Sequence, residues 1–151
     1  MKSRRREFLA AVAASTVACG GHPSRWRFLT QPEADTLAAV CARIIPADRD
    51  PGAAEAGVVD YIDRQLAGFY KAHQKIYRDG LASLGAGFVK LSPDEQTAAL
   101  KALEKKHSPF FDLVLTHTMQ GFYGSPRHGG NRDAVSWKML GVPYPPVRGR
   151  A

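Results

Sequence analysis

The densest set of residues that could bind another molecule lies near the C-terminus, in the stretch GFYGSPRHGGNRDAVSWKMLG at positions 121–141. Arginine and histidine offer hydrogen-bond donors and aromatic rings offer apolar area, and such residues are enriched where proteins bind one another. Glycine and asparagine accept positive φ at little cost, so this backbone can pass close to another surface. The candidate partner-binding residues are Phe122, Tyr123, Arg127, His128, Gly129, Gly130, Asn131, Arg132 and Trp137. Docking of a partner, internal packing of the tryptophan beneath the last helix, and a small-ligand pocket all remain open for this segment.

The other reactive side chains form no recognisable catalytic or metal-binding set along the sequence. The five histidines are scattered, with no pair at i, i+4 and no cysteine ligand beside them. The sequence holds no CxxCH haem motif, phosphate loop or nucleophile elbow. Asp48, Asp50 and Glu55 lack the alternating ligands of a calcium loop, which favours a turn and a helix start. We therefore expect no catalytic residue, no metal and no cofactor in this chain, and His117 is interpreted as a boundary residue rather than a base.

The first residues have the layout of an export signal. A cationic start is followed by a modest apolar stretch over residues 8–18, which is too short to span a bilayer. Arg5, Arg6, Phe8 and Leu9 match the twin-arginine pattern S/T-R-R-x-F-L, with Ser3 before them. A basic amphipathic helix is the alternative. The pattern predicts a cleavable twin-arginine signal and a periplasmic protein.

The end of this signal resembles a lipobox, the motif in which a cysteine is acylated after cleavage. Cys19 follows small Val17 and Ala18, but Thr16 stands where leucine is usual. Acylation of Cys19 and ordinary cleavage nearby are therefore both open, and two or three acyl chains would anchor the protein to the membrane. The expected layout is a signal peptide at 1–18, a tether at 19–28, a helical domain at 29–143 and a Pro/Arg tail at 144–151.

The body of the chain has helical periodicity throughout, and no segment alternates with the period of a strand. Capping boxes at Thr30 and Ser92 each open a helix, and Ser108 begins the last strong one. Its apolar stripe is predicted to include Leu115 and Met119. The prediction is an all-α fold, a single small domain of about five helices with an irregular Gly-rich C-terminal segment.

Composition fits one globular domain and argues against nucleic acid as a partner. The net charge of the 151 residues is +7, but the first seven residues contribute +3 of it. A nucleic-acid footprint needs basic residues concentrated on a reading element, and no such cluster is present in the sequence. Cys41 falls on the apolar stripe of the first helix, so we expect a small buried hydrophobe there.

Several blocks of this sequence resemble the gluconate 2-dehydrogenase subunit 3 family. The resemblance extends over about residues 28–143 and includes the Ile-Ile-Pro-x-Asp…Pro-Gly-Ala block and the Gly-Gly-Asn-Arg…Trp-Lys segment. Ser136 departs from the glycine that the family commonly carries before the tryptophan.

The resemblance implies an accessory subunit without a cofactor of its own. In such complexes a large FAD-dependent subunit of the glucose–methanol–choline class oxidises a sugar or sugar acid, and a cytochrome c subunit with haem c receives the electrons. The small subunit is implied to supply the export signal and to assist maturation. A solitary periplasmic lipoprotein with a binding or scaffolding role and a self-sufficient enzyme are the competing hypotheses.

Overall fold

The computed structural model describes residues 24–143, and these residues contain six α-helices and no strand. The all-α prediction is confirmed. The signal peptide, Cys19 and the tail after residue 143 lie outside the described residues. The helices are α1 (Gln31–Ile44), α2 (Val58–Ala67), α3 (Gln74–Leu84), α4 (Pro93–Lys105), α5 (Pro109–Tyr123) and α6 (Val135–Met139). Short 3-10 turns are η1 (Lys71–His73), η2 (Phe88–Lys90), η3 (Pro126–His128) and η4 (Arg132–Ala134).

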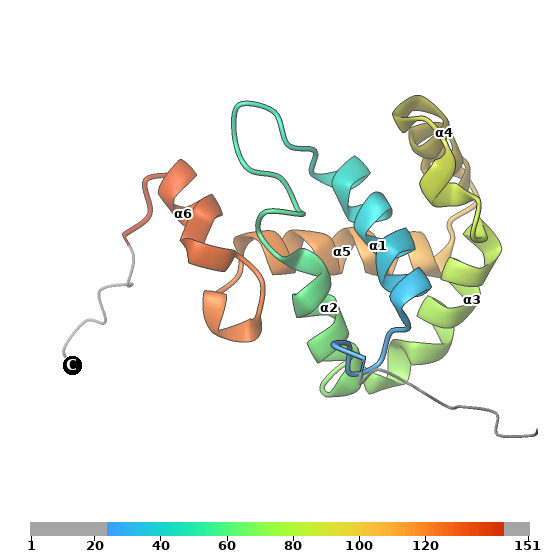
Figure 1. Ribbon diagram of the computed structural model, residues 1–151, viewed down its shortest axis with the longest axis horizontal. Coiled ribbons are helices and arrows are strands. Elements are labelled where there is room, and N and C mark those ends of the chain that lie inside the picture. The colour runs from blue at the N-terminus through green and yellow to red at the C-terminus, as the bar shows by residue number, and fades with distance from the viewer. Residues whose placement is uncertain (1–23, 144–151) are drawn as a thin grey trace, which may run out of the picture.

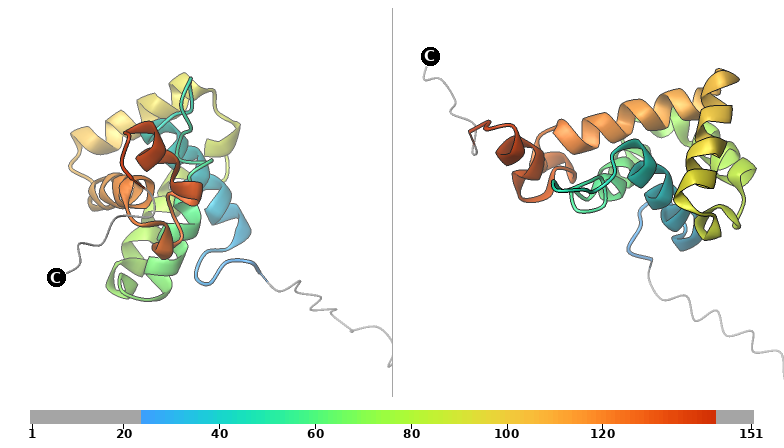
Figure 2. Two further views of the ribbon diagram at one scale, coloured as in Figure 1. Left: turned by 90° about the vertical axis from the view of Figure 1, so that its left-hand side faces the viewer. Right: turned by 90° about the horizontal axis from the view of Figure 1, so that it is seen from above.

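Helix α5 is the central element, because it packs against α1, α2, α3, α4 and α6. Seen from above, α5 lies along one side of the body with α1 and α2 along the other (Figure 2). Helices α3 and α4 lie at one end and α6 at the opposite end (Figure 1). The largest fully buried core side chains come from α1, α2, α3, η2 and α5: Leu37, Val40, Val58, Ile62, Leu66, Tyr77, Phe88, Val114 and Phe122.

Two helices begin where the capping pattern predicts. At α4 the Ser92 Oγ accepts a hydrogen bond from the Glu95 backbone N–H at 3.3 Å, and the Ser92 N–H donates to the Glu95 carboxylate at 2.8 Å. At α1 the Thr30 N–H donates to the Glu33 carboxylate at 2.8 Å. Partial burial alone would raise the pKa of Glu33, but hydrogen bonds from Arg78 and Thr30 lower it by more. The pKa of Glu33 therefore lies below its usual range. These contacts satisfy amides that a helix start leaves without partners.

The structure differs from the periodicity-based expectation at several positions. The segment expected to be irregular contains α6, a helix of five residues. Leu115 and Met119 are exposed rather than buried, because α5 is apolar around more of its circumference than its neighbours cover. His117, expected at the boundary of the stripe, is 3% exposed. Cys41 is buried as expected, and burial raises the pKa of its thiol to about 12.

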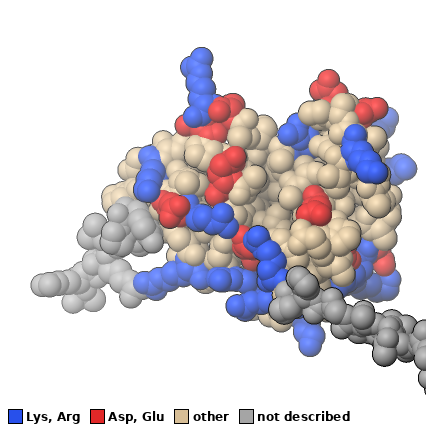
Figure 3. All heavy atoms as spheres, in the orientation of Figure 1, with Lys and Arg blue, Asp and Glu red and all other residues tan. Residues whose placement is uncertain are grey.

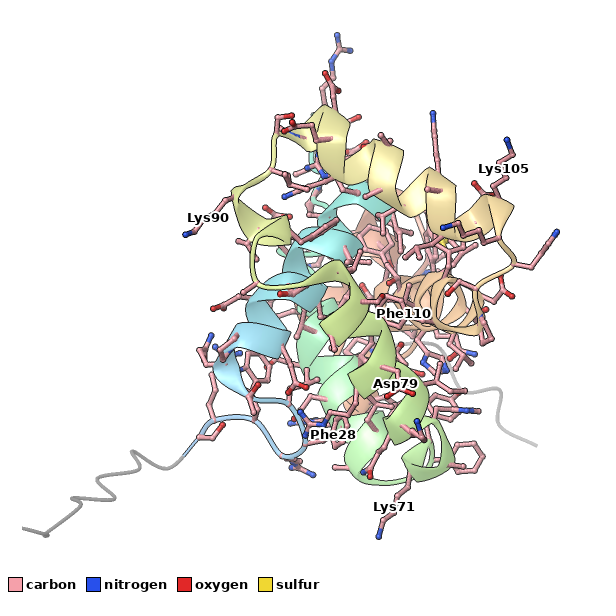
Figure 4. The ribbon with its side chains drawn as sticks, turned by 90° about the vertical axis from the view of Figure 1, so that its right-hand side faces the viewer. Phe28, Lys71, Asp79, Lys90, Lys105 and Phe110 are labelled. Carbon is pink, nitrogen blue, oxygen red and sulfur yellow. The ribbon has the colours of Figure 1, made fainter. Side chains whose placement is uncertain are left out.

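The segment that leads into α1 is fastened to the body by one buried carboxylate. Asp63 on α2 accepts hydrogen bonds from the backbone N–H groups of Arg27 at 2.8 Å, Phe28 at 3.0 Å and Leu29 at 3.0 Å. The Arg78 guanidinium adds a hydrogen bond to the Phe28 carbonyl at 2.7 Å and lies over the Phe28 ring. Figure 4 shows Phe28 against the lower part of the helical body. Residues 24–28 of the predicted tether therefore lie against the domain.

We predict that Asp63→Ala lowers the free energy of unfolding by about 2–5 kcal/mol, because three backbone donors lose a charged acceptor where water is largely excluded. Asp35→Ala is the matched control, since Asp35 is an exposed aspartate whose Oδ1 accepts from the side chain of Gln31. Urea unfolding followed by circular dichroism measures both. Equal losses in the two variants would contradict the anchoring role of Asp63.

Candidate functional site

The predicted docking loop is held in shape by Asn131, which is fully buried. Its side-chain Nδ2 donates to the Gly124 carbonyl at 2.9 Å, and its Oδ1 accepts from the Ser136 N–H at 3.0 Å. Asn131 also adopts a left-handed backbone with φ 44°, a conformation that asparagine accepts more readily than most residues. The amide therefore connects the start of the loop to α6.

Two glycines let the loop approach its neighbours closely. A Cβ at Gly130 would lie 2.1 Å from the Gly121 carbonyl oxygen of α5, so no side chain fits there. Gly129 has φ +102°, and a Cβ there would lie 2.8 Å from Cδ of Arg64 on α2. The positive φ expected from the sequence is present at Gly129 and Asn131, whereas Gly130 serves close approach instead.

The aromatic residues of the predicted site divide between the interior and the surface. Phe122 is buried in the core, and Trp137 is half-buried with its Nε1–H donating to the Tyr123 carbonyl at 2.7 Å. Tyr123, Arg127 and His128 are exposed. Trp137 is therefore hydrogen-bonded to the last residue of α5, and the side chains of Tyr123, Arg127 and His128 are available to another molecule.

Arg132 joins the loop to both α2 and the N-terminal segment. Its guanidinium pairs with Asp60 Oδ2 at 2.7 Å, while Arg25 pairs with Asp60 Oδ1, also at 2.7 Å. The Arg132 N–H donates to the Ala56 carbonyl at 3.0 Å. One carboxylate thus bridges two segments that are more than 100 residues apart in sequence.

These contacts border an open polar hollow of about 390 Å³, which sequence reasoning missed. Its lining residues are Arg25, Arg27, Asp60, Asp63, Arg64, Gly129 and Arg132. Side chains of Lys and Arg gather along the lower edge of the face drawn in Figure 3. No spacing in the sequence links the N-terminal arginines to α2, because they are brought to it by long-range contacts, the backbone hydrogen bonds to Asp63 and the ion pair of Arg25 with Asp60.

A second feature missed in the sequence is an exposed apolar stripe on α5. Leu115, Met119 and Tyr123 recur at intervals of four residues, and all three are exposed. Residues four apart lie on one face of a helix. The stripe therefore runs along α5 to the start of the candidate loop. The sequence could have indicated it, because α5 carries more apolar residues than one buried face requires.

Comparison with known proteins identifies the family. The model of gluconate 2-dehydrogenase subunit 3 matches residues 31–143, which is most of the chain. The chain belongs to this family. Its family makes it a subunit of a complex of the gluconate 2-dehydrogenase type. Searches of curated proteins and of solved structures each gave no match.

Ser136 of this subunit 3 chain departs from the glycine expected of the family, and its surroundings agree with glycine. The side chain is fully buried, and Oγ has no hydrogen-bond partner among the described residues. A buried hydroxyl without a partner is unfavourable. The backbone N–H of Ser136 keeps its bond to Asn131, so the loop retains its geometry.

Within residues 24–143 of the subunit, no group of three or more His, Cys, Asp and Glu residues is arranged to hold a metal ion. Asp48 and Asp50 instead form a turn, in which the Asp50 N–H donates to the Asp48 carboxylate at 2.9 Å. The helices within the same residues are each too short or too polar to span a membrane.

His117 lies in a cluster of aromatic residues between η1, α3 and α5. Its Nδ1 is 2.9 Å from the Tyr77 hydroxyl, and its ring stacks on Tyr70 with centroids 4.3 Å apart. Burial and the neighbouring His73 lower the pKa of His117 to about 4. Tyr61 and Tyr70 both donate to Gln120 Oε1, at 3.1 and 3.0 Å. These contacts join the α2–α3 connection to α5, with His117 in its neutral form.

We predict that the subunit loses stability as the pH falls below 6.5, because the unfolded chain then binds a proton that folded His117 excludes down to about pH 4. The loss between pH 6.5 and 5.0 is about 2 kcal/mol. Urea unfolding at several pH values measures it. His117→Gln should be less stable at pH 7 and show a shallower pH dependence, and an unchanged slope would contradict the prediction.

Proposed function

We propose that this chain is the non-catalytic small subunit of a periplasmic, membrane-associated FAD-dependent dehydrogenase that acts on gluconate, glucose or a related sugar. In this proposal the large flavin-containing subunit performs the oxidation, and a cytochrome c subunit carries haem c and receives the electrons. This chain provides the twin-arginine signal for the flavoprotein and assists its maturation and assembly. It carries no cofactor itself.

The observation that supports this function best is the exposed α5 stripe beside the candidate loop, in a chain of the subunit 3 family. Leu115, Met119 and Tyr123 provide apolar area, and Arg127 and His128 provide hydrogen-bond donors at one end of it. Aromatic, Met and Arg residues are enriched at protein interfaces. The large flavoprotein subunit is the proposed occupant of this surface.

The internal hydrogen bonds of the loop support the same role. Asn131 and Gly130 fix the backbone against α5, so the exposed side chains are presented by a rigid support. A preorganised surface loses less conformational entropy on binding than a flexible one. The Asp63 anchor likewise joins the segment after the signal directly to the folded body, which suits export of a folded complex.

We predict that Leu115→Ser with Met119→Ser weakens the complex with the flavoprotein roughly tenfold or more, because truncated interface anchors commonly cost more than about 1 kcal/mol each. The tagged chain is purified from its native host, and flavin absorbance per mole of chain is measured. Val89→Ser with Leu91→Ser is the control, since both residues are exposed and lie at η2 or directly after it. Equal flavin recovery in the two double variants would exclude α5 as the docking face.

A second prediction concerns the export signal. Changing Arg5 and Arg6 to lysine should remove both this chain and the flavoprotein from the periplasm, because the apolar stretch that follows is weak. Cell fractionation with flavin and immunoblot detection measures the distribution. A flavoprotein that still reaches the periplasm in this variant would show that it does not depend on this signal for export.

A further inference from the structure

The edge of the molecule along α2, from beside the start of this helix to just after its end, combines basic side chains with an exposed aromatic ring. We call it the basic edge and define it as Arg25, Arg27, Arg64, Phe69, Lys71 and Arg132. Four of these residues line the polar hollow described above, and Phe69 and Lys71 follow directly after α2. Figure 4 shows Lys71 below Phe28, with its side chain pointing away from the body.

The charges on the basic edge are only partly neutralised by the chain itself. Asp60 is shared between Arg25 and Arg132, and Asp63 is occupied by three backbone N–H groups. Among residues 24–143, the guanidinium groups of Arg27 and Arg64 form no ion pair. The edge therefore carries a net positive charge, directed outward.

Phe69 is the most exposed of the large hydrophobic side chains described, with 86% of its surface accessible. An isolated exposed apolar residue carries little information. Phe69, however, has Lys71 two residues away and comes directly after α2, the helix that carries Arg64. A ring flanked by basic residues is the composition with which proteins bind the interface of an anionic bilayer.

The chain also enters the folded body at this edge. The described residues begin at Ser24, and the next residue, Arg25, is paired with Asp60 of α2. Cys19 precedes Ser24 by five residues, so its Cα lies within about 18 Å of Ser24 even in a fully extended chain. A signal peptide in the bilayer, or an acyl chain on Cys19, would keep the basic edge close to the lipid headgroups.

We propose that the basic edge binds directly to an anionic lipid surface, with Phe69 at the headgroup level and the arginines on lipid phosphates. This contact adds to any acyl chain on Cys19 and does not depend on the flavoprotein. The hollow suits headgroups better than a small apolar ligand, because its lining residues are charged or glycine, whereas small-molecule sites are mainly apolar.

The test uses the processed chain from the periplasm and vesicles of phosphatidylcholine with or without 30% phosphatidylglycerol. Phe69→Trp reports immersion through quenching by brominated lipid, and Val89→Trp is the matched reporter at an exposed position on η2. We expect strong quenching of tryptophan at position 69 and little at position 89, beyond the background of Trp26 and Trp137. Both reporters carry the same N-terminus, so acylation does not favour either one.

The arginines are tested separately by vesicle sedimentation. Arg27→Gln with Arg64→Gln should weaken the phosphatidylglycerol-dependent binding roughly 10- to 30-fold, and Arg49→Gln with Lys101→Gln, two exposed charges outside the edge, should not. Equal quenching at both reporter positions, or binding indifferent to the arginine pair, would overturn the proposal. The proposal would also be overturned if the chain bound hexaglutamate through Arg27 and Arg64 but did not bind vesicles. That result would indicate that the basic edge binds an acidic protein segment.

Discussion

The structure depends on one buried carboxylate. Asp63 of α2 accepts hydrogen bonds from three consecutive backbone N–H groups, so the segment before α1 is fixed to α2 although it has no secondary structure of its own. An ionised group in such a position is tolerated only because hydrogen bonds replace its water. The donors, in turn, have no other acceptor within the described residues. The carboxylate and the three N–H groups therefore supply each other's hydrogen-bond partners, and the N-terminal segment becomes part of the domain.

Helix α2 is consequently the meeting point of distant parts of the chain. Asp60, one turn before Asp63, pairs with Arg25 before α1 and with Arg132 after α5. The N-terminal segment and the C-terminal loop are therefore held against the same helix. This arrangement supports the accessory role in export and assembly that we propose. The N-terminal segment from residue 24 and the loop beside the exposed α5 stripe are both held by α2.

Local patterns were sufficient to predict much of the fold. The capping boxes at Thr30 and Ser92 and the apolar spacing located the helices, since these signals act over a few residues. The burial of α5 was predicted less well, because periodicity cannot tell which of several apolar faces a neighbour will cover, and Leu115 and Met119 proved to be exposed. The polar hollow was out of reach. It joins residues far apart in the sequence through backbone hydrogen bonds to Asp63 and ion pairs with Asp60, and no local pattern encodes contacts of such long range.

Amide hydrogen exchange tests most directly whether the N-terminal segment, α2 and the C-terminal loop form one unit. The amides of Arg27, Phe28 and Leu29 lie outside any helix but donate to Asp63, and the Ser136 amide donates to Asn131. The account predicts that these amides are protected from exchange to a degree comparable with the interior amides of α2. Exchange of the three N-terminal amides at the rate of an unstructured peptide, with α2 still protected, would contradict it.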